Sequence, residues 1–170
     1  MDKTKPGRIV VMGVSGCGKT AVGRALAASL GLRFVDADSL HSPQNIAKMA
    51  AGQPLDDTDR AGWLEALADL IATEDRLVLA CSALKRRYRD RLRRSDPALT
   101  FLYLHGSFRT ISTRMRSRDD HYFAGEHMLK SQFDQLEEPR DEGVLHVSVE
   151  PGLEAVIDAS LAALGAAPAR

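Results

Sequence analysis

The sequence predicts an α/β fold: a three-layer, doubly wound, five-stranded parallel sheet. Five short apolar runs alternate with amphipathic segments of helix length, which is typical of a parallel sheet with crossover helices. The first run also leads directly into a glycine-rich loop and then a helix, the context in which backbone amides bind phosphate. The predicted strands are residues 8–12, 32–36, 77–81, 99–104 and 144–149.

The composition fits one compact domain with a sizeable core. The chain has 170 residues, of which 44% are hydrophobic and 27% charged. Its formal net charge is zero, so no overall field attracts nucleic acid or a membrane surface. We find neither the apolar centre of a signal peptide nor an apolar run near the roughly 20 residues that span a bilayer. We therefore expect a single cytoplasmic domain over residues 1–170, with no nucleic-acid or membrane partner.

The loop after the first strand has the spacing Gly-x-x-x-x-Gly-Lys-Ser/Thr. Its residues are Gly13, Val14, Ser15, Gly16, Cys17, Gly18, Lys19 and Thr20. Glycines let backbone N–H groups turn toward phosphate oxygens, and the helix that follows directs its positive end at the same anion. Lys19 is placed to reach the β- and γ-phosphates of a nucleotide, and Thr20 to bind Mg²⁺. The motif leaves the acceptor and the reaction open.

Helix signals fill the gaps between the strands. Apolar residues recur every four positions in residues 19–30, and Gly31 is a plausible C-terminal cap. A short helix is expected around Pro43, and a longer one begins where acidic residues gather at 56–59. Later helices are predicted over residues 107–117, 128–136 and 152–164.

Two carboxylates, Asp36 and Asp38, follow the second strand directly. The carboxyl ends of parallel strands form the edge at which ligands bind. Asp36 could therefore support a metal-bound water while Asp38 faces an acceptor hydroxyl. The alternative is that Asp38 only caps the following turn.

Residues 39–60 are polar and loop-rich, and they follow the same edge, which suits a small substrate-binding insertion. The strongly basic run 85–94 has two interpretations, a solvated helix face or a nucleic-acid contact, and the balanced charge of the chain favours the first. Lys85 lies nearest the strand end and is the member of that run best placed to reach a ligand.

A polar, glycine-containing segment at about 118–130 is expected to form a mobile lid. Arg114 and Arg118 lie one helical turn apart before it, where arginines can stack on adenine or neutralise a transferring phosphate. Surface salt bridges are the alternative role for both.

Several motifs lie in a fixed order between Ile9 and Ile157. They are the glycine loop, Asp36-Ala37-Asp38-Ser39-Leu40-His41, Pro43-x-Asn45-x-x-Lys48-Met49, Gly52-x-Pro54-Leu55-x-Asp57-x-Asp59-Arg60-x-x-Trp63-Leu64, Cys81-Ser82-Ala83-Leu84-Lys85-x-x-Tyr88-Arg89, Arg114-x-x-x-Arg118-x-x-His121-Tyr122-Phe123 and Gln132-Phe133-x-x-Leu136-Glu137-x-Pro139. In order and spacing they resemble the bacterial-type gluconokinase family. The resemblance implies the fold of the P-loop nucleoside-monophosphate and shikimate kinases, with strand order 2-3-1-4-5. It also implies ATP-dependent phosphorylation of D-gluconate at the 6-hydroxyl to 6-phosphogluconate, and a homodimer.

On this hypothesis each candidate residue has a role in phosphoryl transfer. Lys19, the loop amides and Mg²⁺ hold the phosphates, Asp38 accepts the hydroxyl proton, and Arg118 closes over the transferring group while Arg114 packs on adenine. Gluconate carries one carboxylate and several hydroxyls, so its site needs cations and hydrogen-bonding groups. The candidates for this site are His41, Lys48, Arg60, Lys85 and Arg89.

Two positions depart from what is expected of such kinases. The third strand ends in Cys81-Ser82 instead of the Asp that often supports Mg²⁺, which leaves Asp36 as the candidate. Cys17 occupies a loop position where a small residue such as Ser is expected, and we predict that oxidation of its thiol would obstruct ATP entry.

Three alternative functions remain open from the sequence. A shikimate or nucleoside-monophosphate kinase would share the fold and differ in residues 39–60. A GTPase-type switch should carry Asn-Lys-x-Asp, which the sequence lacks. A nucleic-acid-binding ATPase would use the basic run 85–94 and bind in a salt-dependent manner.

Overall fold

The structure is a computed structural model that describes residues 6–118 and 122–166. Its five strands are β1 (Arg8–Met12), β2 (Arg33–Asp36), β3 (Leu77–Ala80), β4 (Thr100–His105) and β5 (Leu145–Ser148). All pair in parallel, in the order β2-β3-β1-β4-β5. The predicted sheet and strand order are confirmed, and the glycine loop follows the central strand.

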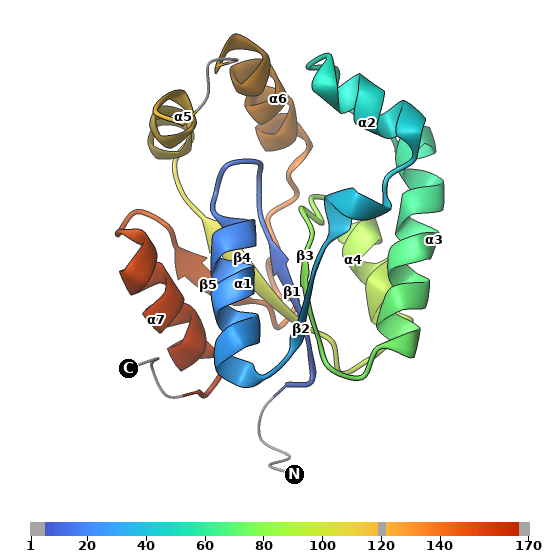
Figure 1. Cartoon of the computed structure of the whole chain (residues 1–170), viewed down its shortest axis with the longest axis vertical. Helices are drawn as coiled ribbons and strands as arrows, with labels where there is room; N and C mark the ends of the chain where they lie inside the picture. The colour runs from blue at the N-terminus through green and yellow to red at the C-terminus, as the bar shows by residue number, and fades with distance from the viewer. Residues whose placement is uncertain (1–5, 119–121, 167–170) are drawn as a thin grey trace.

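Helices cover both faces of this sheet and one of its ends (Figure 1). They are α1 (Lys19–Leu30), α2 (Pro43–Ala50), α3 (Asp57–Thr73), α4 (Arg86–Arg93), α5 (Phe108–Arg116), α6 (Tyr122–Gln135) and α7 (Leu153–Ala163), with a 3₁₀ turn, η1, at Ala37–Leu40. Helices α1 and α7 lie on one face and α3 and α4 on the other, while α2, α5 and α6 stand beyond the carboxyl ends of the strands. Within the described ranges, no helix is long and apolar enough to cross a membrane.

The core has two halves, one on each side of the sheet. Ile9 and Val11 of β1 pack in the cluster that contains Leu26 of α1, whereas Val10 and Met12 pack in the cluster that contains α3 and α4. All four β1 side chains are fully buried. Burial on both faces explains why the strand is continuously apolar instead of alternating.

Local signals set the helix ends close to where the sequence predicts them. Gly31 ends α1 in the left-handed conformation, with φ of 66°. Asp56 and Asp59 form a capping box at the start of α3, and Ser107 accepts a hydrogen bond from the Thr110 amide at the start of α5. The caps at the starts of α3 and α5 satisfy amides, and the cap at the end of α1 a carbonyl, that would otherwise lack a partner.

The predicted boundary of α6 is wrong, because the helix begins at Tyr122 instead of near Met128. Gly125 does not interrupt it, since one glycine costs a helix only about 1 kcal/mol. A Cβ at Gly125 would lie 3.1 Å from Cε of Met115, so the glycine also allows close packing of α5 and α6. Much of the expected lid is therefore helical, while residues 119–121 of that segment lie outside the described residues.

Candidate active site

A cavity of about 840 Å³ opens at the carboxyl edge of the sheet, bordered by the glycine loop, η1, the α2–α3 segment and α6. It brings together most of the polar residues that the sequence singled out. Those that line it are Ser15, Gly16, Gly18, Lys19, Thr20, Asp36, Asp38, His41, Arg60 and Arg118.

The glycines of the loop are required by its backbone. Gly13, Gly16 and Gly18 have φ of 147°, 79° and 101°, a region that L side chains rarely adopt. A Cβ at Gly13 would lie 2.6 Å from the carbonyl oxygen of Leu104. The loop can therefore hold its shape only without side chains at these positions.

Lys19 and Thr20 lie beside the first of the two carboxylates. Nζ of Lys19 donates to the Val14 carbonyl at 3.0 Å, and Oγ1 of Thr20 donates to Oδ2 of Asp36 at 3.2 Å. The other oxygen of Asp36 accepts from the Asp38 amide at 3.0 Å. Asp36 is therefore the cap of η1, the role that the sequence left open for Asp38.

The Thr20–Asp36 pair has the chemistry of a magnesium site. Mg²⁺ prefers oxygen ligands and is usually held by one or two protein groups together with phosphates and waters. Among the described residues, no group of three or more His, Cys, Asp or Glu side chains is arranged to hold a metal ion. A hydroxyl and a carboxylate at the phosphate loop fit an ion that arrives with the nucleotide.

Asp38 is free of the capping role and faces the cavity. Partial burial raises the pKa of its carboxyl group, and the negative charge of Asp36 acts in the same direction, while Lys19 and His41 oppose both. Its side chain is still 74% exposed, which leaves it accessible to an acceptor.

Two cations of the insertion differ in their partners. Nζ of Lys48 lies 2.6 Å from Oδ2 of Asp59 and is already neutralised. Arg60 is only 8% exposed, and it donates to neutral groups, Oε1 of Gln135 at 2.6 Å and the Tyr88 hydroxyl at 3.2 Å. Among the described residues, no carboxylate forms an ion pair with Arg60, so its charge remains available to a ligand.

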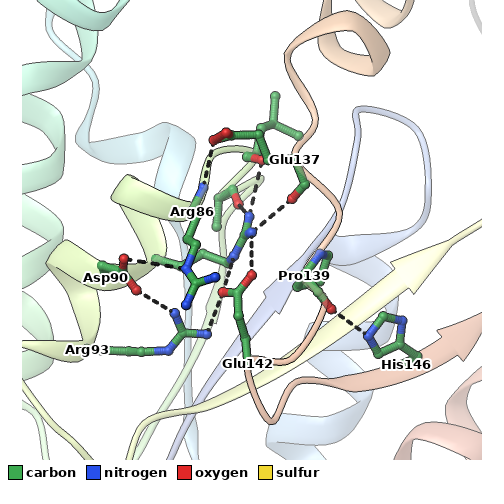
Figure 2. Close-up of polar contacts among 10 residues, drawn as sticks. Arg86, Asp90, Arg93, Glu137, Pro139, Glu142 and His146 are labelled. Atoms are coloured by element: carbon green, nitrogen blue, oxygen red, sulfur yellow. Dashed lines mark hydrogen bonds and ion pairs between the residues drawn. The ribbon is translucent and has the colours of Figure 1, made fainter.

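Lys85 and Arg89 do not line the cavity, so this arrangement gives no support to their predicted contact with substrate. Lys85 is paired with Asp57 at 3.1 Å. Arg89 is fully buried, where it binds Glu142 through two nitrogens at 2.9 and 2.8 Å and donates to main-chain carbonyls. Figure 2 shows Glu142 linked in turn to Arg93. Arg89 thus holds the segment after α6 against the start of α4.

The two arginines near the lid are placed differently. Arg118 is exposed at the cavity. Arg114 turns away and donates to the carbonyl oxygens of Val149, Glu150 and Pro151, in the loop after β5. In this arrangement Arg114 fixes that loop and does not line the cavity.

Gln132 of α6 lines the cavity, and we did not predict it as a site residue from the sequence. Its Oε1 accepts a hydrogen bond from the Ser15 amide at 2.5 Å, one of the loop N–H groups expected to bind phosphate. Gly125, Met128 and Gln132 all line the cavity, and their spacing is that of one helix face. A polar residue on that face was the available signal, but it required α6 to begin at Tyr122.

Cys17 is a poor redox sensor. Its side chain is buried beneath the loop, and this burial raises the pKa of the thiol, with Lys19 opposing the shift. Oxidation requires an accessible thiolate. The predicted obstruction of ATP entry therefore loses its structural basis.

Comparison with known proteins agrees with this arrangement. The sequence model of the shikimate kinase family matches residues 15–149. The thermoresistant gluconokinase of Escherichia coli (strain K12) is 45% identical over 89% of this chain and 90% of that protein, and the gluconokinase of Gluconobacter oxydans is 42% identical over 91% and 89%. The chain belongs to the gluconokinase family. A solved gluconokinase from Sinorhizobium meliloti 1021 has a TM-score of 0.89, with 45% identity over 94% of this chain and 92% of that one.

More distant structures show what is shared at the level of the fold. The shikimate kinase of Aquifex aeolicus covers 93% of this chain with a TM-score of 0.57 at 20% identity. The two gluconokinase relatives match at 45% and 42% identity over about nine-tenths of this chain. The chain is therefore an ATP-dependent kinase of the gluconokinase family.

Proposed function

We propose that this protein transfers the γ-phosphoryl group of ATP to the 6-hydroxyl of D-gluconate, giving 6-phosphogluconate and ADP. The observation that carries the proposal is that one cavity is lined by a phosphate-binding loop, the Asp38 carboxylate and Arg60, a buried cation with no carboxylate partner among the described residues. A guanidinium can bind the carboxylate of gluconate through two parallel hydrogen bonds. Lys48 and Lys85 are less suited, because each is already paired with an aspartate.

Catalysis in this proposal depends on position and charge. The loop amides and Lys19 hold the phosphates, and Asp38 orients the acceptor hydroxyl and takes its proton. Arg118 is the exposed cation that can approach the transferring group when the lid closes. Arg114 would have to leave the loop after β5, or support adenine from there, to serve the nucleotide.

Thr20 and Asp36 would hold Mg²⁺, Thr20 through its hydroxyl and Asp36 through a bound water. Bound to the nucleotide, the ion would neutralise charge on the phosphates. The division of the chain into one kinase domain with an insertion at 39–60 and a lid, the homodimer and the cytoplasmic location are part of the same proposal. Their support is the family resemblance.

The test is ADP release with Mg·ATP against gluconate, other sugar acids, shikimate and nucleoside monophosphates, followed by identification of the phosphorylated product. We expect release that depends on gluconate and a product phosphorylated at the 6-hydroxyl. Release with shikimate or a nucleoside monophosphate alone would keep the kinase fold and reject the acceptor.

Arg60→Met sharpens this test. We expect the variant to lose the preference for gluconate over D-glucitol, which carries a hydroxyl group where gluconate has its carboxylate. Lys48→Met is the matched control, because Lys48 is already paired. If Arg60→Met kept the full preference, another cation would hold the carboxylate.

A further inference from the structure

The imidazole of His41 is held in one plane at the wall of the cavity. Its ring stacks on the indole of Trp63, with centroids 4.4 Å apart and planes 12° apart. Nε1 of Trp63 donates to the Ala37 carbonyl at 2.7 Å, which fixes the indole in turn. Rotation of the imidazole is therefore restricted, and what it offers a ligand depends on which ring nitrogen carries the proton.

The side-chain amide of Asn45 determines which ring nitrogen of His41 carries the proton. Nδ2 of Asn45 lies 2.7 Å from the main-chain carbonyl oxygen of Asp59 and 3.2 Å from Nδ1 of His41. A carbonyl oxygen only accepts, so the NH₂ end of the amide must face Asp59, because the reversed amide would place two acceptors in contact. The second hydrogen of the same NH₂ group then points at His41, whose Nδ1 must be the acceptor.

A neutral imidazole that accepts at Nδ1 carries its proton on Nε2. Burial lowers the pKa of His41, and Arg60 on α3 acts in the same direction, while Asp38 on η1 opposes both. The remaining charges nearby, Lys48 on α2 and Asp59 on α3, neutralise each other at 2.6 Å. His41 is thus neutral at pH 7 and has one N–H group to offer.

We propose that Asn45 is a positioning residue that holds His41 as the Nε2–H tautomer, so that the imidazole donates a hydrogen bond to a hydroxyl group of the acceptor beside Asp38. Nε2 of His41 lies 3.9 Å from Oδ1 of Asp38, too far for a direct hydrogen bond. One hydroxyl oxygen at about 2.8 Å from each atom fits between them, accepting from the imidazole and donating to the carboxylate. This pair of groups selects a hydroxyl, because an ether or carbonyl oxygen cannot donate to Asp38. The inference rests on the proposed function for the identity of the acceptor.

The tautomer can be measured on the whole protein without any substrate. In protein labelled with ¹⁵N-histidine, the nitrogen shifts of His41 near pH 7 should report an unprotonated Nδ1 and a protonated Nε2. His41→Gln removes one set of signals and so assigns them among the five histidines of the chain. A proton on Nδ1, or a mixture of both tautomers, would overturn the proposal whatever the acceptor proves to be.

Asn45→Asp tests the consequence for the acceptor. A carboxylate at this position can only accept, so the proton should move from Nε2 to Nδ1, and Nε2 can then no longer donate to the acceptor. We expect KM for the acceptor to rise about 10-fold, the cost of roughly one hydrogen bond, while KM for ATP stays within about twofold. The acceptor used is whichever compound the wild-type protein phosphorylates, so a failure of the gluconate assignment is detected separately.

Ser42→Ala is the matched control. Oγ of Ser42 caps α2 by accepting from the main-chain amide of Asn45, so its loss loosens the same helix turn and leaves the Asn45 side chain in place. We expect this variant to keep both the tautomer and the acceptor KM. Equal KM increases in Ser42→Ala and Asn45→Asp, with the Nε2–H tautomer retained in both, would show a purely structural role and overturn the proposal. If Asn45→Asp does not fold, the wild-type spectrum alone decides.

Discussion

The cavity and the buried charge cluster of Arg89, Arg93 and Glu142 are both polar regions that use arginine, and they differ in whether the charge is already neutralised. In the cluster, Glu142 is 3% exposed, accepts two hydrogen bonds from Arg89 and forms an ion pair with Arg93. In the cavity, the guanidinium of Arg60 contacts only neutral oxygens among its described partners. The first arrangement stabilises the fold, and the second leaves binding capacity for a ligand.

This difference predicts two separate classes of variant. Changes in the cluster should lower stability and leave the kinetics of the folded protein nearly unchanged. Changes to the polar side chains of the cavity should alter binding or turnover at nearly constant stability, because these side chains are not part of the core clusters.

The largest effect is expected from Asp38→Asn in the cavity. The amide cannot accept the hydroxyl proton, so turnover should fall by about 10²-fold or more, the usual range for a lost general base. ATP affinity and the melting temperature should be unchanged. Asp69→Asn, on the exposed surface of α3, is the matched control. Turnover near that of the wild type would remove Asp38 from the mechanism. It would also weaken the distinction between a functional cavity and a structural charge cluster.

In the cluster, Glu142→Gln should reduce the free energy of unfolding by about 3–5 kcal/mol, because it leaves the fully buried Arg89 without its counter-charge. Denaturant unfolding at pH 7 measures this. Glu138→Gln is the control in the same segment, since Glu138 pairs with Arg140 at the surface and should matter by less than about 1 kcal/mol. Equal effects of the two variants would show that the cluster is no more important than a surface pair.

The same pair of variants gives a pH dependence. The hydrogen bond from Arg89 lowers the pKa of Glu142 and Arg93 contributes, while burial opposes them. The contribution of the carboxylate is therefore complete above its unfolded pKa of about 4.3 and is lost as pH falls through the lower folded value. The stability gap between wild type and Glu142→Gln should be constant near neutrality and should narrow below about pH 4. A gap that widened on acidification would contradict this assignment.

The sequence could not separate Arg60 from Arg89, although it predicted the strands and the phosphate loop correctly. Strands and loop follow from local patterns, namely apolar runs and glycines whose backbone excludes side chains. Whether an arginine is neutralised depends on distant segments: Glu142 lies 53 positions from Arg89, and Gln135 lies 75 from Arg60. Composition and spacing carry no information about such pairs.

The start of α6 was missed for a related reason. The local sequence around Gly125 indicates a lid, whereas in the structure this glycine permits contact with Met115 of another helix. Gln132 could not be recognised as a cavity residue until that helix was placed.

A smaller effect is expected from Gln132→Ala, which tests whether Gln132 occupies part of the phosphate-binding loop before the nucleotide binds. ATP must displace Oε1 of Gln132 from the Ser15 amide, at a cost of about 0.5–1.5 kcal/mol. The variant should therefore bind ATP about 2- to 10-fold more tightly in a calorimetric titration. Gln135, one turn further along α6, contacts Arg60 instead. Gln135→Ala should therefore affect only the binding of the acceptor. Weaker ATP binding in Gln132→Ala would mean that Gln132 contacts the nucleotide and does not compete with it.

The smallest effect is expected from Cys17→Ser, which tests whether a buried group can be functional without facing the cavity. A Cβ at Gly13 would lie 2.8 Å from Sγ of Cys17, so the thiol packs beneath the loop, where burial raises its pKa and keeps it protonated. Inactivation by peroxide should proceed at the wild-type rate, and ATP affinity should change by less than about twofold, because the loop binds phosphate with its backbone. Protection of the variant from peroxide would show that the loop opens far enough to expose Sγ. The loop would then be more mobile than its close packing against Leu104 implies. Its glycines would in that case allow the loop to move, in addition to allowing its backbone conformation.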